Sequence, residues 1–122
     1  MLARLGFAIA LLGLLVAPAA AQDLKADKAQ LAKVEKQYVA AKAAFTKKPK
    51  DAKLKKAYVD ATVKFGTATM TSNALPPRSK YPGALKLYRE ALKVDPKNDE
   101  AKNNAAMIEA IYKQMGRPVP KG

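Results

Sequence analysis

The stretch YPGALKLYREALKVDPKN, residues 81 to 98, decides the fold of this chain. Its apolar residues recur three or four positions apart, the spacing of one face of a helix. They are Tyr81, Ala84, Leu85, Tyr88, Ala91 and Leu92. Asp95 precedes a proline and is therefore biased away from the helical conformation. We expect a helix from about residue 79 to 94, with Pro82 tolerated in its first turn.

Three further segments have helical spacing, at about 23–46, 51–73 and 98–115, and no segment alternates with a period of two. The sequence therefore predicts an all-α protein of four antiparallel helices. The first has a narrow stripe of Leu24, Leu31, Tyr38 and Phe45, which favours packing on the chain's own helices over a two-chain coiled coil. The second has two apolar stripes, so we expect neighbours on both of its sides. Asp51 is the expected N-cap of the second helix, and Gly116 is expected to end the fourth.

The N-terminal segment has the pattern of a secretory signal. Arg4 precedes an apolar run from Leu5 to Val16, and small residues follow up to Ala21. We expect cleavage between Ala21 and Gln22, with release into the periplasm or the medium. The alternative is an uncleaved membrane anchor, but the run is shorter than the roughly 20 residues that span a bilayer. The expected division is a signal peptide at 1–21, a helical domain at 22–116 and a flexible tail at 117–122.

Composition argues against catalysis. The 122 residues include no histidine and no cysteine, so the commonest general base, the thiol nucleophile and most transition-metal ligands are absent. The acidic residues are scattered along the sequence. The spacing Tyr38-x-x-x-Lys42 matches a short reductase motif, but no glycine-rich phosphate loop accompanies it, and we interpret the match as chance. We predict no enzyme, no cofactor, no metal and no small-molecule substrate.

The residues after Lys80 resemble a known repeat. Ala84-x-x-x-Tyr88, then Ala91-Leu92, then Asp95-Pro96-x-Asn98, is similar to the second helix and closing turn of a tetratricopeptide repeat (TPR), over about residues 80–115. The alternative is an ordinary helical hairpin. The resemblance implies an adaptor or scaffold whose groove holds a protein or peptide partner. The groove residues that it implies are Lys55, Val59, Thr62, Lys102, Asn103, Asn104, Met107 and Ala110.

Charge supports an alternative binding mode. The chain has 23 basic and 10 acidic residues, a formal net charge of +13, which attracts anionic surfaces at long range. Six lysines cluster within ten residues: Lys47, Lys48, Lys50, Lys53, Lys55 and Lys56. This cluster is either a patch that binds anionic polymers or membrane headgroups, or a solvated surface. No aromatic residue interleaves it at a spacing that suggests base stacking, so we expect no specific nucleic-acid recognition.

Overall fold

The computed structural model describes residues 19–122, which form four helices and no strand, so the all-α prediction is confirmed for this part of the chain. The helices are α1 (Ala19–Lys47), α2 (Ala52–Thr71), α3 (Pro77–Val94) and α4 (Asp99–Gln114). The predicted signal peptide lies outside the described residues except for its last three positions, which fall in the first turn of α1. Within residues 19–122 no helix has the length and apolar character needed to span a membrane.

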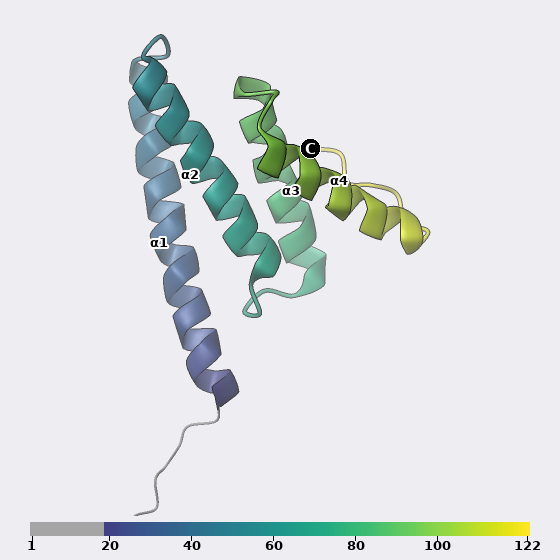
Figure 1. Ribbon diagram of the computed structural model, residues 1–122. Coiled ribbons are helices and arrows are strands. Elements are labelled where there is room, and N and C mark those ends of the chain that lie inside the picture. The colour runs from purple at the N-terminus through teal and green to yellow at the C-terminus, as the bar shows by residue number, and fades with distance from the viewer. Residues whose placement is uncertain (1–18) are drawn as a thin grey trace, which may run out of the picture.

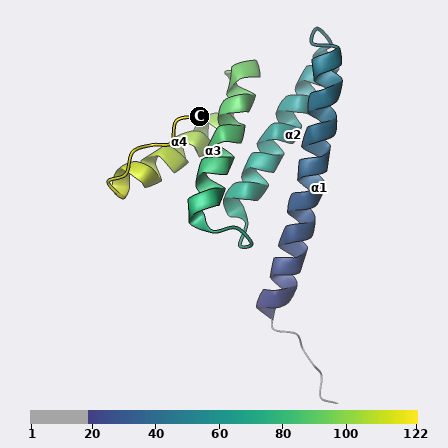
Figure 2. The ribbon, with the colours of Figure 1, turned by 180° about the vertical axis from the view of Figure 1, so that it is seen from behind.

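Helices α1, α2 and α3 lie side by side in chain order, and α4 lies across α3 (Figure 1). The view from behind shows the same order, with the N-terminal end of α1 extending past the α2–α3 loop (Figure 2). Helix α2 contacts α1 and α3, as its two apolar stripes predicted. Helix α4 packs mainly on α3. The order of the helices therefore makes α2 the support for both of its neighbours.

Local signals explain most of the helix ends. The Asp51 carboxylate accepts from the backbone N–H groups of Lys53 and Leu54, which confirms Asp51 as the N-cap of α2. The Asn98 side chain accepts from the Ala101 N–H at the start of α4. Gly116 has φ +63°, a left-handed conformation that ends α4, as the sequence predicted.

The start of α3 differs from the prediction. The helix begins at Pro77 rather than near residue 79, because proline suits the first helical position, where its missing N–H has no helical partner. Pro82 therefore lies inside the helix and not in its first turn. It cannot donate to the carbonyl of residue 78, so one bond of the helical ladder is absent there.

The core is built around α3. Ala84, Leu85, Tyr88 and Ala91 are fully buried and pack with Val59 and Val63 of α2 and with three residues of α4, namely Ala101, Ala105 and Ile108. Gly66 of α2 lies so close to Tyr88 that a Cβ placed on it would be 2.9 Å from the ring. Met115 is half-exposed because it lies just past the end of α4.

Asp27 connects the long first helix to the α2–α3 loop. In the sequence it is a charged residue between Leu24 and Leu31, where it interrupts the apolar stripe of the first helix. In the structure its carboxylate accepts from the Asn73 N–H at 2.6 Å and from the Ser72 hydroxyl at 3.2 Å. Ser72 is buried and caps the C-terminus of α2. The interruption is therefore a tertiary hydrogen-bonding site that fixes the loop against α1.

Candidate functional site

A cleft of the described chain lies between α1 and α3. Both helices pack on α2, and along their described lengths they do not contact each other through their backbones. The cleft has a volume of about 920 Å³, within the usual range for ligand sites. We call it the basic cleft. Its lining residues are Tyr38, Lys42, Phe65, Thr69, Gly83, Lys86, Leu87, Arg89, Glu90, Lys93, Val119, Pro120, Lys121 and Gly122.

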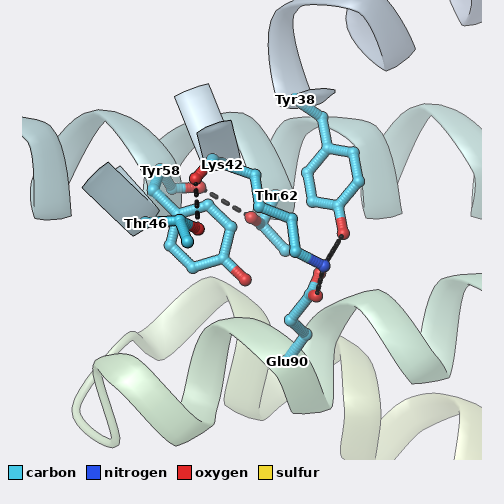
Figure 3. A network of polar contacts seen from close by, with 6 residues as sticks. All are labelled: Tyr38, Lys42, Thr46, Tyr58, Thr62 and Glu90. Atoms are coloured by element: carbon cyan, nitrogen blue, oxygen red, sulfur yellow. Dashed lines mark hydrogen bonds and ion pairs between the residues drawn. The ribbon is translucent and has the colours of Figure 1, made fainter. Parts of the chain in front are cut away.

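Three polar side chains bridge α1 and α3 at the edge of the cleft (Figure 3). The Tyr38 hydroxyl donates to Glu90 Oε2 at 2.5 Å, and Lys42 Nζ donates to Glu90 Oε1 at 2.7 Å. Lys42 Nζ is also 3.2 Å from the Tyr38 hydroxyl. The hydroxyl of Tyr58, on the intervening α2, points toward the same carboxylate. Three side chains from α1 and α2 thus converge on one carboxylate of α3.

An aromatic ladder beneath this network sets its position. Phe45 stacks on Tyr58 with ring centroids 5.1 Å apart, and Tyr58 stacks on Tyr38 at 6.3 Å. Tyr38 also contacts Phe65 at 5.4 Å. Such ring contacts stabilise a pair beyond the area that they bury. The ladder holds α1 against α2 at the level where Tyr38 reaches over to α3.

The network stabilises each group in its ordinary protonation state. Burial alone would raise the pKa of Glu90, but hydrogen bonds from Lys42 and Tyr38 outweigh burial, and the pKa falls below its usual value. The hydrogen bond to Glu90 is the main cause of the raised pKa of Lys42. Burial, followed by the Glu90 charge, raises the pKa of Tyr58 to about 12. At neutral pH Glu90 is therefore ionised, Lys42 is protonated and the tyrosines are neutral.

The cleft has a surplus of positive charge. Its lining includes one acidic residue, Glu90, and five basic ones, Lys42, Lys86, Arg89, Lys93 and Lys121. Lys42 is paired with Glu90, and Arg89 is 3.7 Å from Glu109 of α4. The other three lysines form no ion pair with any residue in 19–122. The lining therefore carries unpaired cations, and it also includes the rings of Tyr38 and Phe65, which we call the aromatic floor.

The C-terminal segment, which the sequence predicted to be a flexible tail, forms one wall of the cleft, and its flexibility stays a prediction. After Gly116 the chain turns back, with the Arg117 N–H donating to the carbonyl of Tyr112. The Arg89 guanidinium donates to the backbone oxygens of Pro120 at 2.6 Å and Gly122 at 3.1 Å. Val119 packs against the core. The left-handed turn and the arginine together explain why the segment lies on α3.

The groove residues implied by the TPR resemblance do not form one surface. Val59 is buried in the core, and Thr62 is fully buried with its hydroxyl bonded to the Tyr58 carbonyl, so neither side chain is open to a partner. Asn104 donates to the Tyr88 hydroxyl. The exposed members are Lys55 on α2 and, on α4, Lys102, Asn103, Met107 and Ala110. The hollow beside Lys55 is completed by the α3–α4 turn rather than by these α4 residues.

The lysine cluster lies at the turn between α1 and α2, at the opposite end of α2 from the α2–α3 loop (Figure 1). All six lysines, 47, 48, 50, 53, 55 and 56, are exposed. Lys56 is paired with Asp60 at 2.9 Å on the same helix. The structure therefore groups these charges on an open surface, and their role stays a prediction.

Sequence reasoning missed the basic cleft, although two signals for it are present. Lys86, Arg89 and Lys93 have the spacing of one helical face, and Tyr38 and Lys42 are one turn apart on another helix. What joins the two sets is Glu90, whose bonds to α1 cross 52 and 48 positions of sequence. Spacing within a helix cannot show such a contact.

Comparisons with known proteins add no relative: no family model matches the chain, and no curated protein or solved structure matches it significantly. Four packed helices alone do not distinguish a TPR-like repeat from another helical arrangement. Within residues 19–122 no group of three or more His, Cys, Asp or Glu side chains is placed to hold a metal ion. The site is therefore interpreted from its own residues.

Proposed function

We propose that this protein is an exported, non-enzymatic interaction module that holds a segment of a partner protein in the basic cleft. The observation that carries the proposal is the cleft itself: about 920 Å³, an aromatic floor, and three lysines that are unpaired among the described residues. Apolar floors with a few polar anchors are typical of binding sites. In this proposal the helices form two antiparallel pairs, the second TPR-like.

The chemistry of the network favours binding over catalysis. A general acid or base works best with a pKa near the operating pH. The pKa of Glu90 is lowered and those of Lys42, Tyr38 and Tyr58 are raised, so every group moves away from neutrality. Such groups hold their protons fixed at pH 7. The network is better suited to bridging α1 and α3 beside a bound segment.

The TPR-like part of the proposal is supported by the packing of small residues. Ala84 and Ala91 have no exposed surface and lie where α3 meets its neighbours. Pro96 follows α3 directly, in the turn that leads into α4. These are the positions on which the resemblance depends. Export is supported by residues 1–21 alone, and an N-terminus at Gln22 in secreted material would test it, whereas an intact Met1 in the membrane fraction would contradict it.

A second candidate function rests on the lysine cluster at the α1–α2 turn. Its six lysines are exposed, and Lys56 alone among them has an ion pair within the described chain. Such a surface fits an anionic polymer or membrane headgroups. Binding of that kind displaces counterions, so affinity falls steeply and log-linearly with salt. The cleft has an aromatic floor that the turn lacks, and for this reason we place the partner there.

The proposal is tested by comparing three sets of variants in one affinity purification from the native source. The cleft variant is Lys86→Gln with Lys93→Gln. The groove variant is Asn103→Ala with Met107→Ala. The turn variant is Lys47→Gln, Lys48→Gln, Lys50→Gln and Lys53→Gln. All of these positions are exposed, so the fold is expected to survive, and circular dichroism checks this.

The expected result is a discrete protein that the parent retains and that only the cleft variant loses. Loss with the groove variant alone would return the site to the exposed face of α4. The second candidate function would replace the proposal under two conditions. The parent would retain no protein but bind a polyanion or lipid vesicles, and the turn variant alone would lose that binding.

A further inference from the structure

The basic cleft also indicates the chemistry of its ligand. We infer, on the basis of the proposed function, that it takes an extended acidic segment of the partner, with carboxylates three residues apart. Lys86 and Lys93 of α3 bind these carboxylates, and Lys121 of the C-terminal segment lines the same cleft. The inference depends on three features of the cleft: its charge, the conformation of the C-terminal segment, and the spacing of the lysines.

Charge complementarity selects an acidic ligand. Lys86, Lys93 and Lys121 line the cleft and are unpaired within residues 19–122. The single acidic lining residue, Glu90, does not repel a carboxylate strongly, because Lys42 at 2.7 Å and Tyr38 at 2.5 Å already bind its two oxygens. An incoming carboxylate therefore meets a site with a net positive charge.

The C-terminal segment shows that α3 accepts an extended backbone. Pro118 and Pro120 have φ fixed near −65°, and the residue before each is driven to an extended conformation. Arg89 donates to backbone oxygens two positions apart, those of Pro120 and Gly122. An extended chain thus already lies against this helix as a wall. A second extended chain fits between this wall and α1, where the aromatic floor is open.

The distance between the two lysines of α3 indicates how far apart the carboxylates of the ligand are. Lys86 and Lys93 are seven residues apart on α3, which corresponds to about 10.5 Å along the helix axis at ~1.5 Å per residue. In a polyproline II chain, residues three apart point the same way and are separated by about 9.3 Å. Flexible lysine side chains accommodate the difference. Glutamates at every third position of such a chain would reach both lysines.

The test uses a fluorescein-labelled peptide built from the repeat Glu-Pro-Ala, with fluorescence anisotropy as the readout. Its companion peptides are the Gln-Pro-Ala repeat and a peptide of the same composition with its glutamates contiguous. We expect the regular peptide to bind and the glutamine peptide not to bind. Contiguous glutamates should bind several-fold more weakly, because only one lysine can then be reached well.

A matched pair of variants separates the site from the net charge. The cleft variant carries Lys86→Gln and Lys93→Gln. Its control carries Lys48→Gln and Lys50→Gln at the α1–α2 turn. Each variant removes two positive charges. Loss of two partly exposed ion pairs should weaken peptide binding about tenfold in the cleft variant. The variant with Lys48→Gln and Lys50→Gln should stay within about twofold of the parent. Equal losses in the two variants would overturn the inference.

Two further outcomes are decisive. A heparin oligosaccharide or polyphosphate could bind the parent more tightly than the regular peptide does. If the Lys86→Gln, Lys93→Gln variant then loses that binding, the ligand is a polyanion and not an acidic segment. If the regular peptide fails to bind while the affinity purification still yields a cleft-dependent protein, the inference fails and the proposed function stands. If the regular peptide binds but the affinity purification yields no protein, the proposed function is contradicted, while the cleft remains a binding site for acidic peptides.

Discussion

Replacing Gly66 with alanine tests how closely α2 packs on α3. The change raises the helix propensity of α2 but crowds the ring of Tyr88. Gly66 lies within α2, where alanine would normally stabilise the helix by about 1 kcal/mol. The added Cβ, however, would lie 2.9 Å from Cε1 of Tyr88, 3.2 Å from Cδ1 and 3.3 Å from Cζ. Carbon atoms pack best at about 3.5–4.0 Å, so three ring atoms would have to recede together.

The Tyr88 ring has little freedom to move. It is fully buried, and its hydroxyl is 2.8 Å from the Thr67 hydroxyl and accepts from the Asn104 side chain at 3.1 Å. Overpacking of a well-packed core costs about 1–3 kcal/mol. Set against the gain in helix propensity, Gly66→Ala is expected to destabilise the protein by about 0–2 kcal/mol.

Gly83 provides the matched control. It lies within α3, and a Cβ there would be 3.6 Å from Cγ2 of Thr69, an ordinary contact. Gly83→Ala should therefore stabilise by about 0.5–1 kcal/mol through helix propensity alone. Thermal and urea unfolding of both variants would be followed by circular dichroism. A difference of about 0.5–3 kcal/mol between them corresponds to a gap in Tm of at least ~2 °C for a domain of this size.

The comparison has a clear contrary result. If Gly66→Ala raised Tm as much as Gly83→Ala does, Tyr88 would have room to shift, and the close approach of α2 to α3 would not be a determinant of stability. Unchanged urea m-values in both variants would show that the difference arises in the folded state.

Three further changes are expected to act on stability. Ala91→Leu should cost roughly 1–3 kcal/mol because Ala91 is fully buried, whereas Ala106→Leu on the exposed face of α4 should stay within about 0.5 kcal/mol in the same urea unfolding assay. Asp27→Ala should cost about 1 kcal/mol by removing the acceptor of the Asn73 N–H, and an unchanged midpoint would show that the loop is held in another way. Because the pKa of Glu90 is lowered from 4.5, its ionised form stabilises the protein above that pH, and this stabilisation is lost as the pH falls through the lowered value. Unfolding measured from pH 7 to 3 should therefore depend less on pH in Glu90→Gln than in the parent, and identical slopes would contradict the role of the network.

Local signals in the sequence predicted most of the fold. Apolar residues at helical spacing predicted four helices, and their ends moved by only a few residues. Asp51 and Gly116 were identified as a cap and a stop because each acts on backbone groups within one turn of itself. The buried alanines of α3 were recognised from the TPR resemblance. The start of α3 was predicted two residues too late. Pro77 occupies the first helical position, where a proline is tolerated, whereas a proline breaks a helix at later positions.

The sequence alone also predicted the exposed lysine cluster, since six lysines in ten residues cannot all be buried. It did not predict the basic cleft. Helical periodicity tells which residues share a face, but not which face of one helix meets which face of another. That choice depends on how α1 and α3 both rest on α2.

Tertiary structure decided the meaning of four residues that look unremarkable in the sequence. Gly66 appears to weaken a helix, yet it makes room for Tyr88. Asp27 appears to interrupt a stripe, yet it binds the α2–α3 loop. Glu90 joins helices whose backbones do not meet, and Arg89 binds backbone oxygens of Pro120 and Gly122. In each case the partner lies 22 or more positions away in the sequence, and a contact of that range exists only once the helices have packed.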